Sequence, residues 1–157
     1  MAEQTQHETY NDGKRREKAK NLLKGYRDGV TVNGQLLKLI ADAESRLSSA
    51  TAQYEETRSS GMARDALADH IASLEDVIGR LRMEDDILKD NLDDLLIMVT
   101  KATVINPSAG AVLAALYMEP GEAPSMDEVA ERLYRGIDRV KQLHRAGLDI
   151  VADLMGE

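Results

Sequence analysis

The clearest pattern in the chain is a regular spacing of leucine and isoleucine residues in its central third. Apolar residues recur there at alternating steps of four and three, which is the spacing of a coiled-coil helix. The residues at these positions are Leu67, Ile71, Leu74, Ile78, Leu81, Leu88, Leu92, Leu95 and Val99. One acidic residue, Asp85, interrupts them. The pattern therefore predicts a long helix with one apolar stripe and a single carboxylate within it.

A weaker version of the same pattern precedes it, from Lys14 to about Arg58. The apolar members of its stripe are Leu23, Tyr26, Val30, Leu37, Ile40 and Leu47, and its polar members are Asn33, Glu44, Thr51 and Tyr54. Each glycine between residues 25 and 34 costs a helix about 1 kcal/mol relative to alanine. We expect a continuous or kinked helix, with a short strand and turn at VTVNG (30–34) as the alternative.

The turn-rich sequence RSSGM (58–62) separates these two stretches. Helices of matched length with a short connection fold back on each other, so residues 14–104 are predicted to form an antiparallel helical hairpin. Further apolar residues would leave a face uncovered, and we expect a second copy of the chain to cover it. These residues are Leu36, Leu39, Val77, Leu96 and Ile97. Alternatively, the C-terminal residues fold back over that face.

Self-association of the hairpin into a homo-oligomer is expected to use the coiled-coil positions. The candidate oligomerisation residues are Leu37, Ile40, Leu74, Ile78, Leu81, Leu88, Leu92 and Leu95. Residues 1–13 are polar and lack apolar periodicity, which predicts a disordered tail.

After residue 104 the pattern changes to short helices separated by loops. Pro107 disfavours helical geometry at Asn106 and ends the long helix. Residues 108–118 (SAGAVLAALYM) predict a short buried helix, and 119–124 (EPGEAP) a loop. Ser125 and Glu128 form a capping box that starts a helix ending near Tyr134, and another is expected from about 137 to 155. The fold class predicted is all-α: a long hairpin followed by a small domain at 107–157.

The last two helices have the arrangement of a helix-turn-helix, in which the second helix enters the major groove of DNA. Ala130 is the small residue at the expected helix crossing, and the inner faces are expected to meet at Val129, Leu133, Val140 and Leu143. Arginine and glutamine suit hydrogen bonding to base edges, and lysine suits phosphate. The candidate DNA-binding residues are Arg135, Asp138, Arg139, Lys141, Gln142 and Arg145. Two packed helices with a merely solvated charged face are the alternative.

One residue departs from the helix-turn-helix pattern. The first turn position favours a left-handed backbone and usually carries glycine. This chain has Tyr134 there and Gly136 two residues later. A residue other than glycine costs about 1–2 kcal/mol in that conformation. Either the turn is shifted by two residues or it is looser than usual.

The distribution of charge fits this division of the chain. The net charge is −8, which argues against indiscriminate binding of nucleic acid. Residues 55–100 contain twelve acidic and five basic residues, whereas residues 132–145 contain five basic residues and one acidic residue. A second basic cluster, Lys14, Arg15, Arg16, Lys18, Lys20 and Lys24, lies near the N-terminus. The acidic residues thus lie mainly in the predicted hairpin, and the predicted DNA-binding helix is basic.

Other function classes find little support. The chain has no cysteine and only three, widely separated histidines, so we expect no metal site. No phosphate-binding glycine motif or catalytic triad is present, and we expect neither an enzyme, a cofactor nor a small-molecule substrate. Apolar runs are too short to span a membrane, and the N-terminus does not resemble a signal peptide. We therefore expect a cytoplasmic protein.

The C-terminal sequence DEVAERLYRGIDRVKQLHRAGLDIVADL resembles the C-terminal domain of small phage-encoded transcriptional regulators, which is similar to region 4 of sigma factors. The matching skeleton is Glu128-x-Ala130-x-x-Leu133 and Val140-x-x-Leu143-His144-x-x-Gly147-Leu148. The serine-and-glycine connector at 59–69 and the leucine-rich helix at 71–81 are also similar to that family. The chain departs from it at Tyr134, at Gly147, where the family usually has alanine, and in its longer 119–125 loop.

The resemblance implies an activator of late phage genes that binds double-stranded promoter DNA, with RNA polymerase as a further partner. It implies that Arg139, Gln142 and Arg145 contact bases or phosphates, and that Lys141 and Arg135 contact the DNA backbone. Two alternatives come from other classes. Small terminase subunits also join a helix-turn-helix to an oligomerising hairpin, and a coiled-coil scaffold would bind only protein.

Overall fold

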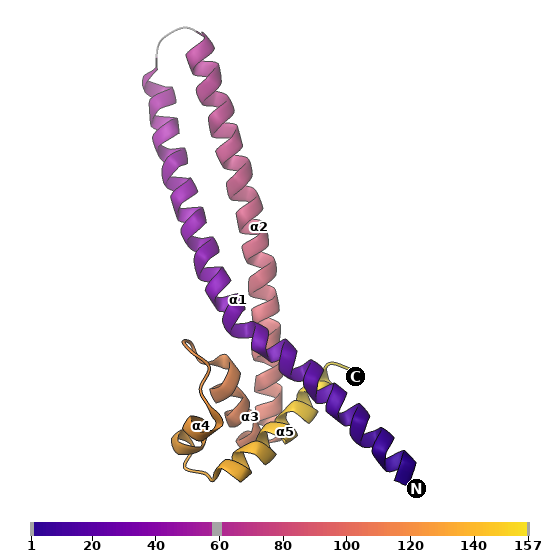
Figure 1. Ribbon diagram of the computed structural model, residues 1–157. Coiled ribbons are helices and arrows are strands. Elements are labelled where there is room, and N and C mark those ends of the chain that lie inside the picture. The colour runs from indigo at the N-terminus through magenta and orange to yellow at the C-terminus, as the bar shows by residue number, and fades with distance from the viewer. Residues whose placement is uncertain (1, 58–60, 157) are drawn as a thin grey trace. The chain divides into compact units, whose positions relative to one another are not determined.

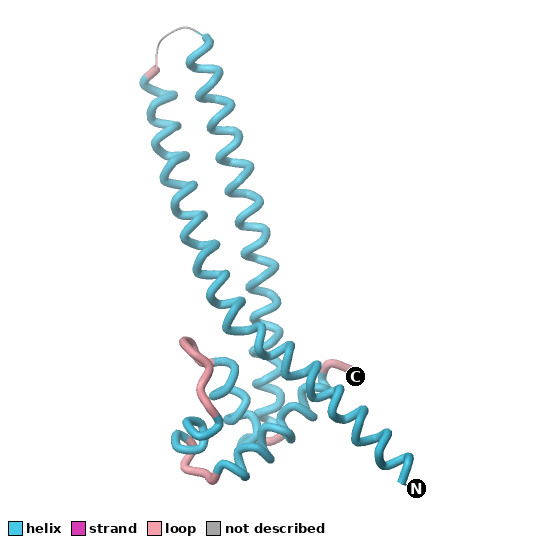
Figure 2. The backbone as a smooth tube through the Cα atoms, in the orientation of Figure 1, coloured by secondary structure: helices cyan, strands magenta, loops and turns pink. Residues whose placement is uncertain are grey.

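The computed structural model describes residues 2–57 and 61–156, and all regular elements in these ranges are helices (Figure 2). Two long helices, α1 (Ala2–Glu56) and α2 (Gly61–Ile105), pack antiparallel and precede shorter ones. These are α3 (Pro107–Leu113), the π-helical turn η1 (Ala114–Met118), α4 (Met126–Arg132) and α5 (Ile137–Leu154) (Figure 1). The predicted all-α class is confirmed. The predicted connector at 58–62 falls largely on residues 58–60, which lie outside the described residues.

The described chain divides into two compact units. The hairpin unit is Thr31–Asp90, and the terminal unit combines Met1–Val30 with Asn91–Glu157. The ends of both long helices thus belong to the same unit as the short C-terminal helices. The short helices need a cover for their apolar faces, and the ends of α1 and α2 provide it.

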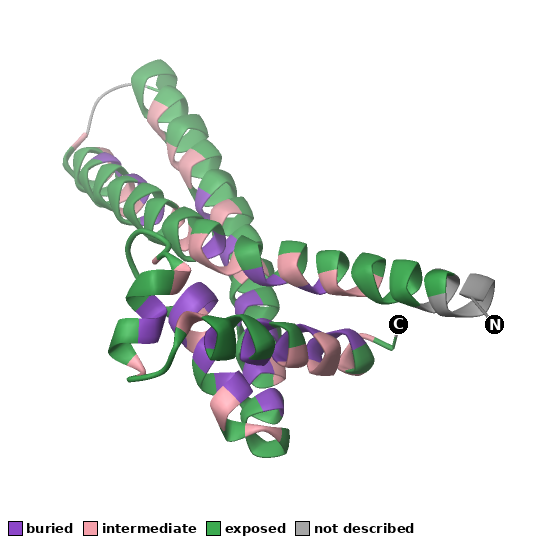
Figure 3. Cartoon of the chain, turned by 60° about the horizontal axis from the view of Figure 1, so that its bottom comes forward, coloured by how far each residue is buried: buried purple, intermediate pink, exposed green. Residues whose placement is uncertain are grey.

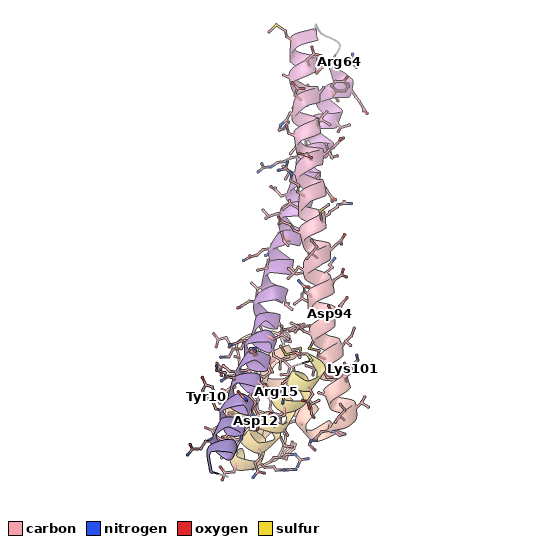
Figure 4. All side chains as sticks on the ribbon, turned by 90° about the vertical axis from the view of Figure 1, so that its right-hand side faces the viewer. Tyr10, Asp12, Arg15, Arg64, Asp94 and Lys101 are labelled. Carbon is pink, nitrogen blue, oxygen red and sulfur yellow. The ribbon has the colours of Figure 1, made fainter. Side chains whose placement is uncertain are left out.

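In the hairpin unit, α1 and α2 meet along an apolar seam. On α1 the buried residues are Ile40, Ala43 and Ala50, with Leu36, Leu47 and Tyr54 half-buried. On α2, Ile78 is buried and its heptad neighbours are half-buried, as the heptad pattern predicts. At the tip, the Arg64 guanidinium lies over the Tyr54 ring, 4.5 Å from its centre (Figure 4). The hairpin therefore has a thin core with a single layer of apolar contact.

The α1 side of this seam corrects the predicted stripe. The sequence pattern placed Leu37, Glu44 and Thr51 on it, but Leu37 is 46% exposed and Leu36 lies inward instead. The inward positions at 43 and 50 are alanines, which contribute little to an apolar pattern although they allow two helices to approach closely. Helix α1 also runs unbroken through 25–34, so the alternative strand and turn at VTVNG is wrong.

The acidic interruption of the seam is a buried polar cluster. The side chain of Asp85 is 5% exposed and forms an ion pair with Lys89 Nζ at 2.9 Å. The Asn33 side-chain amide of α1 donates a hydrogen bond to the other carboxylate oxygen. The hydrogen bond to Asp85 raises the pKa of Lys89. Because a buried carboxylate is costly unless it is paired, these two partners explain how Asp85 is tolerated. The base, Lys89, lies on the same helix as Asp85. The facing helix α1 supplies the Asn33 amide.

The terminal unit has the larger core, which is built from every helix of that unit (Figure 3). Its buried side chains include Leu23 of α1, Val99 of α2, Leu113 of α3, Val129 of α4 and Val151 of α5. The predicted buried helix at 108–118 and the end of α2 before Asn106 are confirmed. Asn106 caps α3 by accepting a hydrogen bond from the Ala109 amide at 3.1 Å.

Helix α1 contributes more to this unit than its sequence predicts. It begins at Ala2, whereas a disordered tail was expected over residues 1–13. Adding a residue to an existing helix costs far less than starting one, so a polar segment can extend a helix that is anchored further along. Arg27 also donates hydrogen bonds to the carbonyl oxygens of Leu116 and Glu119, which satisfies the C-terminal end of η1.

The crossing of α2 and α3 depends on a glycine. A Cβ atom placed on Gly110 would lie 2.5 Å from the Cα of Thr103, a distance that real Cβ atoms essentially never show. Gly110 thus allows the backbones of α2 and α3 to approach each other more closely than a residue with a Cβ atom would allow.

Candidate nucleic-acid interface

Helix α4 starts as its capping sequence predicts. Ser125 is in an extended conformation at the N-cap, and its hydroxyl oxygen accepts a hydrogen bond from the Glu128 amide at 3.2 Å. Asp127 and Glu128 occupy the first turn, where negative charge is favourable. Val129 and Ala130 are buried on the inner side. The Ser125 half of the predicted capping box is confirmed.

The turn between α4 and α5 is a Schellman motif centred on Tyr134. The Tyr134 amide donates to the Glu131 carbonyl at 3.3 Å, and the Arg135 amide donates to the Ala130 carbonyl at 3.0 Å. Tyr134 has a φ of +54°, in the left-handed region. The turn is therefore neither shifted nor looser: Tyr134 occupies the position where glycine is usual.

Helix α5 has one buried and one exposed face over its first three turns. Val140, Leu143 and Gly147 are buried and point into the core formed with α3 and α4. A Cβ atom on Gly147 would lie 2.8 Å from the Leu113 side chain, so the glycine permits close packing against α3. The packing of Val129, Val140 and Leu143 in one core is as the helix-turn-helix prediction requires.

The exposed face of α5 and the turn before it carry the predicted DNA-binding side chains. Every one of them is exposed: Arg135, Asp138, Arg139, Lys141, Gln142 and Arg145. The Arg139 guanidinium donates to the Gln142 side-chain oxygen at 3.4 Å, and Arg135 donates to the Ser108 hydroxyl at 3.2 Å. The structure therefore gathers these side chains at one end of the terminal unit. That they contact DNA stays a prediction.

Further along α5 the outer face is occupied by α1. Arg16 binds Asp149 with two hydrogen bonds, at 2.7 and 3.1 Å, and Arg15 forms an ion pair with Asp153. Arg15 is labelled on α1 in Figure 4. The hydrogen bond to Asp149 raises the pKa of Arg16. Two members of the N-terminal basic cluster thus hold α1 against α5, and the open part of α5 is limited to its N-terminal half.

A buried polar pair ties α5 to η1. The Tyr117 phenol oxygen and His144 Nε2 lie 2.7 Å apart and share a hydrogen bond. Burial lowers the pKa of His144 to about 4, with a smaller contribution from the nearby Lys20. Burial also raises the pKa of Tyr117 to about 12. Both groups are therefore neutral near pH 7. Only their residue types, polar groups within apolar helices, could have suggested this pair from the sequence.

The predicted oligomerisation residues lie mainly within the chain's own hairpin. Ile40, Ile78, Leu92 and Leu95 are buried in the single chain, Leu74, Leu81 and Leu88 are half-buried, and Leu37 remains largely exposed. In the hairpin unit, exposed apolar side chains are instead found at Val32, Leu39, Val77, Met83 and Ile87. Which of these residues a second copy contacts stays a prediction.

In the described ranges no helix combines the length and apolar character that crossing a bilayer requires. Comparisons of the chain with protein-family models, with curated proteins and with solved structures each gave no match.

Proposed function

We propose that the chain is a sequence-specific DNA-binding transcriptional regulator that places the N-terminal half of α5 in the major groove. The observation that carries this proposal is the exposure of Arg139, Gln142 and Arg145 on a helix whose opposite face is buried. A face that projects from a well-packed unit can enter a groove without rearrangement. The helix-turn-helix packing of α4 against α5 supports the same assignment.

The side chains on this face divide by chemistry. Arg139 and Arg145 suit paired hydrogen bonds to guanine, and Gln142 suits adenine. Asp138 can accept a hydrogen bond from the cytosine amino group. Lys141 and Arg135 provide positive charge for the phosphates on either side of the groove. The outer face of α5 and the turn before it thus contain donors and acceptors for several base pairs and cations for the backbone.

The length of the open face bears on the number of copies needed. Residues 138–145 span about 12 Å of helix, similar to the width of the major groove. So short a helix segment reads few base pairs, and regulators of this kind gain specificity by binding two half-sites as dimers. We therefore propose a homo-oligomer that uses exposed apolar residues of the hairpin unit. By its resemblance to phage regulators, it would activate late genes, with RNA polymerase as a second partner.

The test is selection of duplexes from a random pool by the full-length chain, followed by sequencing. The wild type should enrich a defined motif, and its affinity should fall steeply with salt because phosphate contacts release counterions. Arg139→Ala should lose preference at one or two positions of the motif, at a cost of about 1–3 kcal/mol each. Asp93→Ala, an exposed change on α2, is the matched control and should select the wild-type motif.

Two other outcomes would replace this proposal. If the chain binds no duplex even at low salt, a scaffold that binds only protein through the acidic hairpin is the better account. If it binds DNA without sequence preference and light scattering gives a ring of eight or more subunits, the small terminase alternative is favoured.

A further inference from the structure

The turn between α4 and α5 carries a tyrosine where the backbone favours glycine. Tyr134 has a φ of +54°, and in this region the Cβ atom of a bulky residue lies too close to the following carbonyl oxygen. Glycine is the most frequent residue at this position of a Schellman motif because it has no Cβ atom. The turn therefore gains nothing from the tyrosine side chain.

The core gains nothing from it either. Tyr134 is 96% exposed, so its ring has almost no contact with the terminal unit. Tyr117 of the same unit is only 6% exposed and packs in the core. A strained residue that stabilises neither its turn nor its core points to a role in binding a partner.

We propose, on the basis of the function proposed above, that Tyr134 binds the phosphate backbone of duplex DNA beside the groove that α5 enters. Tyr134 precedes the first residue of α5 by three positions. It therefore lies beside the N-terminal end of α5, the end that would enter the groove. An α-helix with its side chains is about as wide as the major groove, so a helix in the groove fills it from one line of phosphates to the other. The turn at the end of such a helix therefore lies close to one of these lines of phosphates.

The chemistry of the neighbouring residues favours the same ligand. Arg135 follows Tyr134 directly, and Arg139 lies in the first turn of α5; both are exposed. These cations attract phosphates, and the tyrosine O–H can donate a hydrogen bond to a phosphate oxygen. Because the phosphate backbone is the same for every sequence, the contact adds affinity and fixes the position of α5 without adding base preference.

The experiment measures the binding of the full-length chain to a short mixed-sequence duplex at low salt by fluorescence anisotropy. Tyr134→Phe removes only the O–H group, and we expect about tenfold weaker binding. Tyr134→Gly should bind at least as weakly, although its melting temperature should rise by about 3 °C because the strain is relieved. Tyr10→Phe changes an exposed tyrosine of α1 (labelled in Figure 4) and should bind like the wild type.

The outcomes separate this inference from the function on which it rests. If the wild type binds and both Tyr134 variants bind equally well, the role of Tyr134 is refuted while DNA binding stands. If Tyr134→Phe binds normally and only Tyr134→Gly is weak, the assigned phosphate hydrogen bond is wrong. If the wild type itself binds no duplex, the proposed function fails independently of Tyr134.

Discussion

Mild acid should destabilise the terminal unit through one residue, His144. Its side chain is buried against Tyr117, and its pKa is lowered from 6.5 to about 4. The unfolded chain therefore binds a proton more readily than the native chain does. The stability that comes from the neutral ring is complete above pH 6.5 and is lost as the pH falls towards 4. The preferential binding of a proton to the unfolded chain lowers the free energy of unfolding by about 2 kcal/mol at pH 5 and about 3 kcal/mol at pH 4.

The assay is urea denaturation followed by circular dichroism at pH 7.5 and pH 5, a range in which most carboxylates stay ionised. His144→Gln retains a polar partner for Tyr117 but cannot titrate. It should be less stable than the wild type at pH 7.5, yet it should lose about 2 kcal/mol less on acidification. His70→Gln, an exposed change in the hairpin unit, should behave like the wild type at both pH values.

Two results would refute this reasoning. One is an equal loss of stability for the wild type and for His144→Gln between pH 7.5 and pH 5. The other is a native His144 pKa near 6.5 in a titration followed by NMR.

Three further changes test the fold. Gly110→Ala should lower the free energy of unfolding, measured by urea denaturation, by about 3 kcal/mol or more, because the new Cβ atom meets the α2 backbone. Gly25→Ala, in open space on α1, should raise it by about 1 kcal/mol. Similar values for both variants would contradict the close approach of α2 and α3. Ser125→Ala should cost about 1 kcal/mol, measured in the same way, through loss of the α4 cap, and no loss would exclude that role. Asn33→Leu should destabilise the hairpin by about 1–3 kcal/mol in thermal denaturation, because it removes a hydrogen bond to the buried Asp85. Asn33→Leu combined with Asp85→Leu should recover that loss, because no buried carboxylate remains. A double variant as unstable as the single one would contradict this account of Asp85.

The elements predicted well from the sequence are those with strong local signals. The heptads of α2, the Asn106–Pro107 break and the Ser125 cap each depend on residues within one or two helical turns, so the sequence determines them directly. The exposed face of α5 belongs to this group, since helical periodicity alone separates Arg139 and Gln142 from Val140 and Leu143.

The features that the sequence did not predict depend on contacts between distant residues. Arg16 and Asp149 are 133 residues apart, and Tyr117 and His144 are 27 apart, so no local pattern relates them. The grouping of the ends of α1 and α2 with the short helices depends on which apolar faces pack together, and no local pattern shows that. The seam on α1 was misplaced because Ala43 and Ala50 are weak apolar signals although they are buried.

The most direct test of the central claim is to map where duplex DNA binds, by adding the selected duplex to the isotope-labelled chain and following backbone amide shifts. We predict that the largest changes fall at residues 134–145, with smaller ones where α1 meets the C-terminal half of α5. Changes concentrated at residues 31–90, or no change at residues 134–145, would contradict the assignment of α5 as the DNA-reading helix.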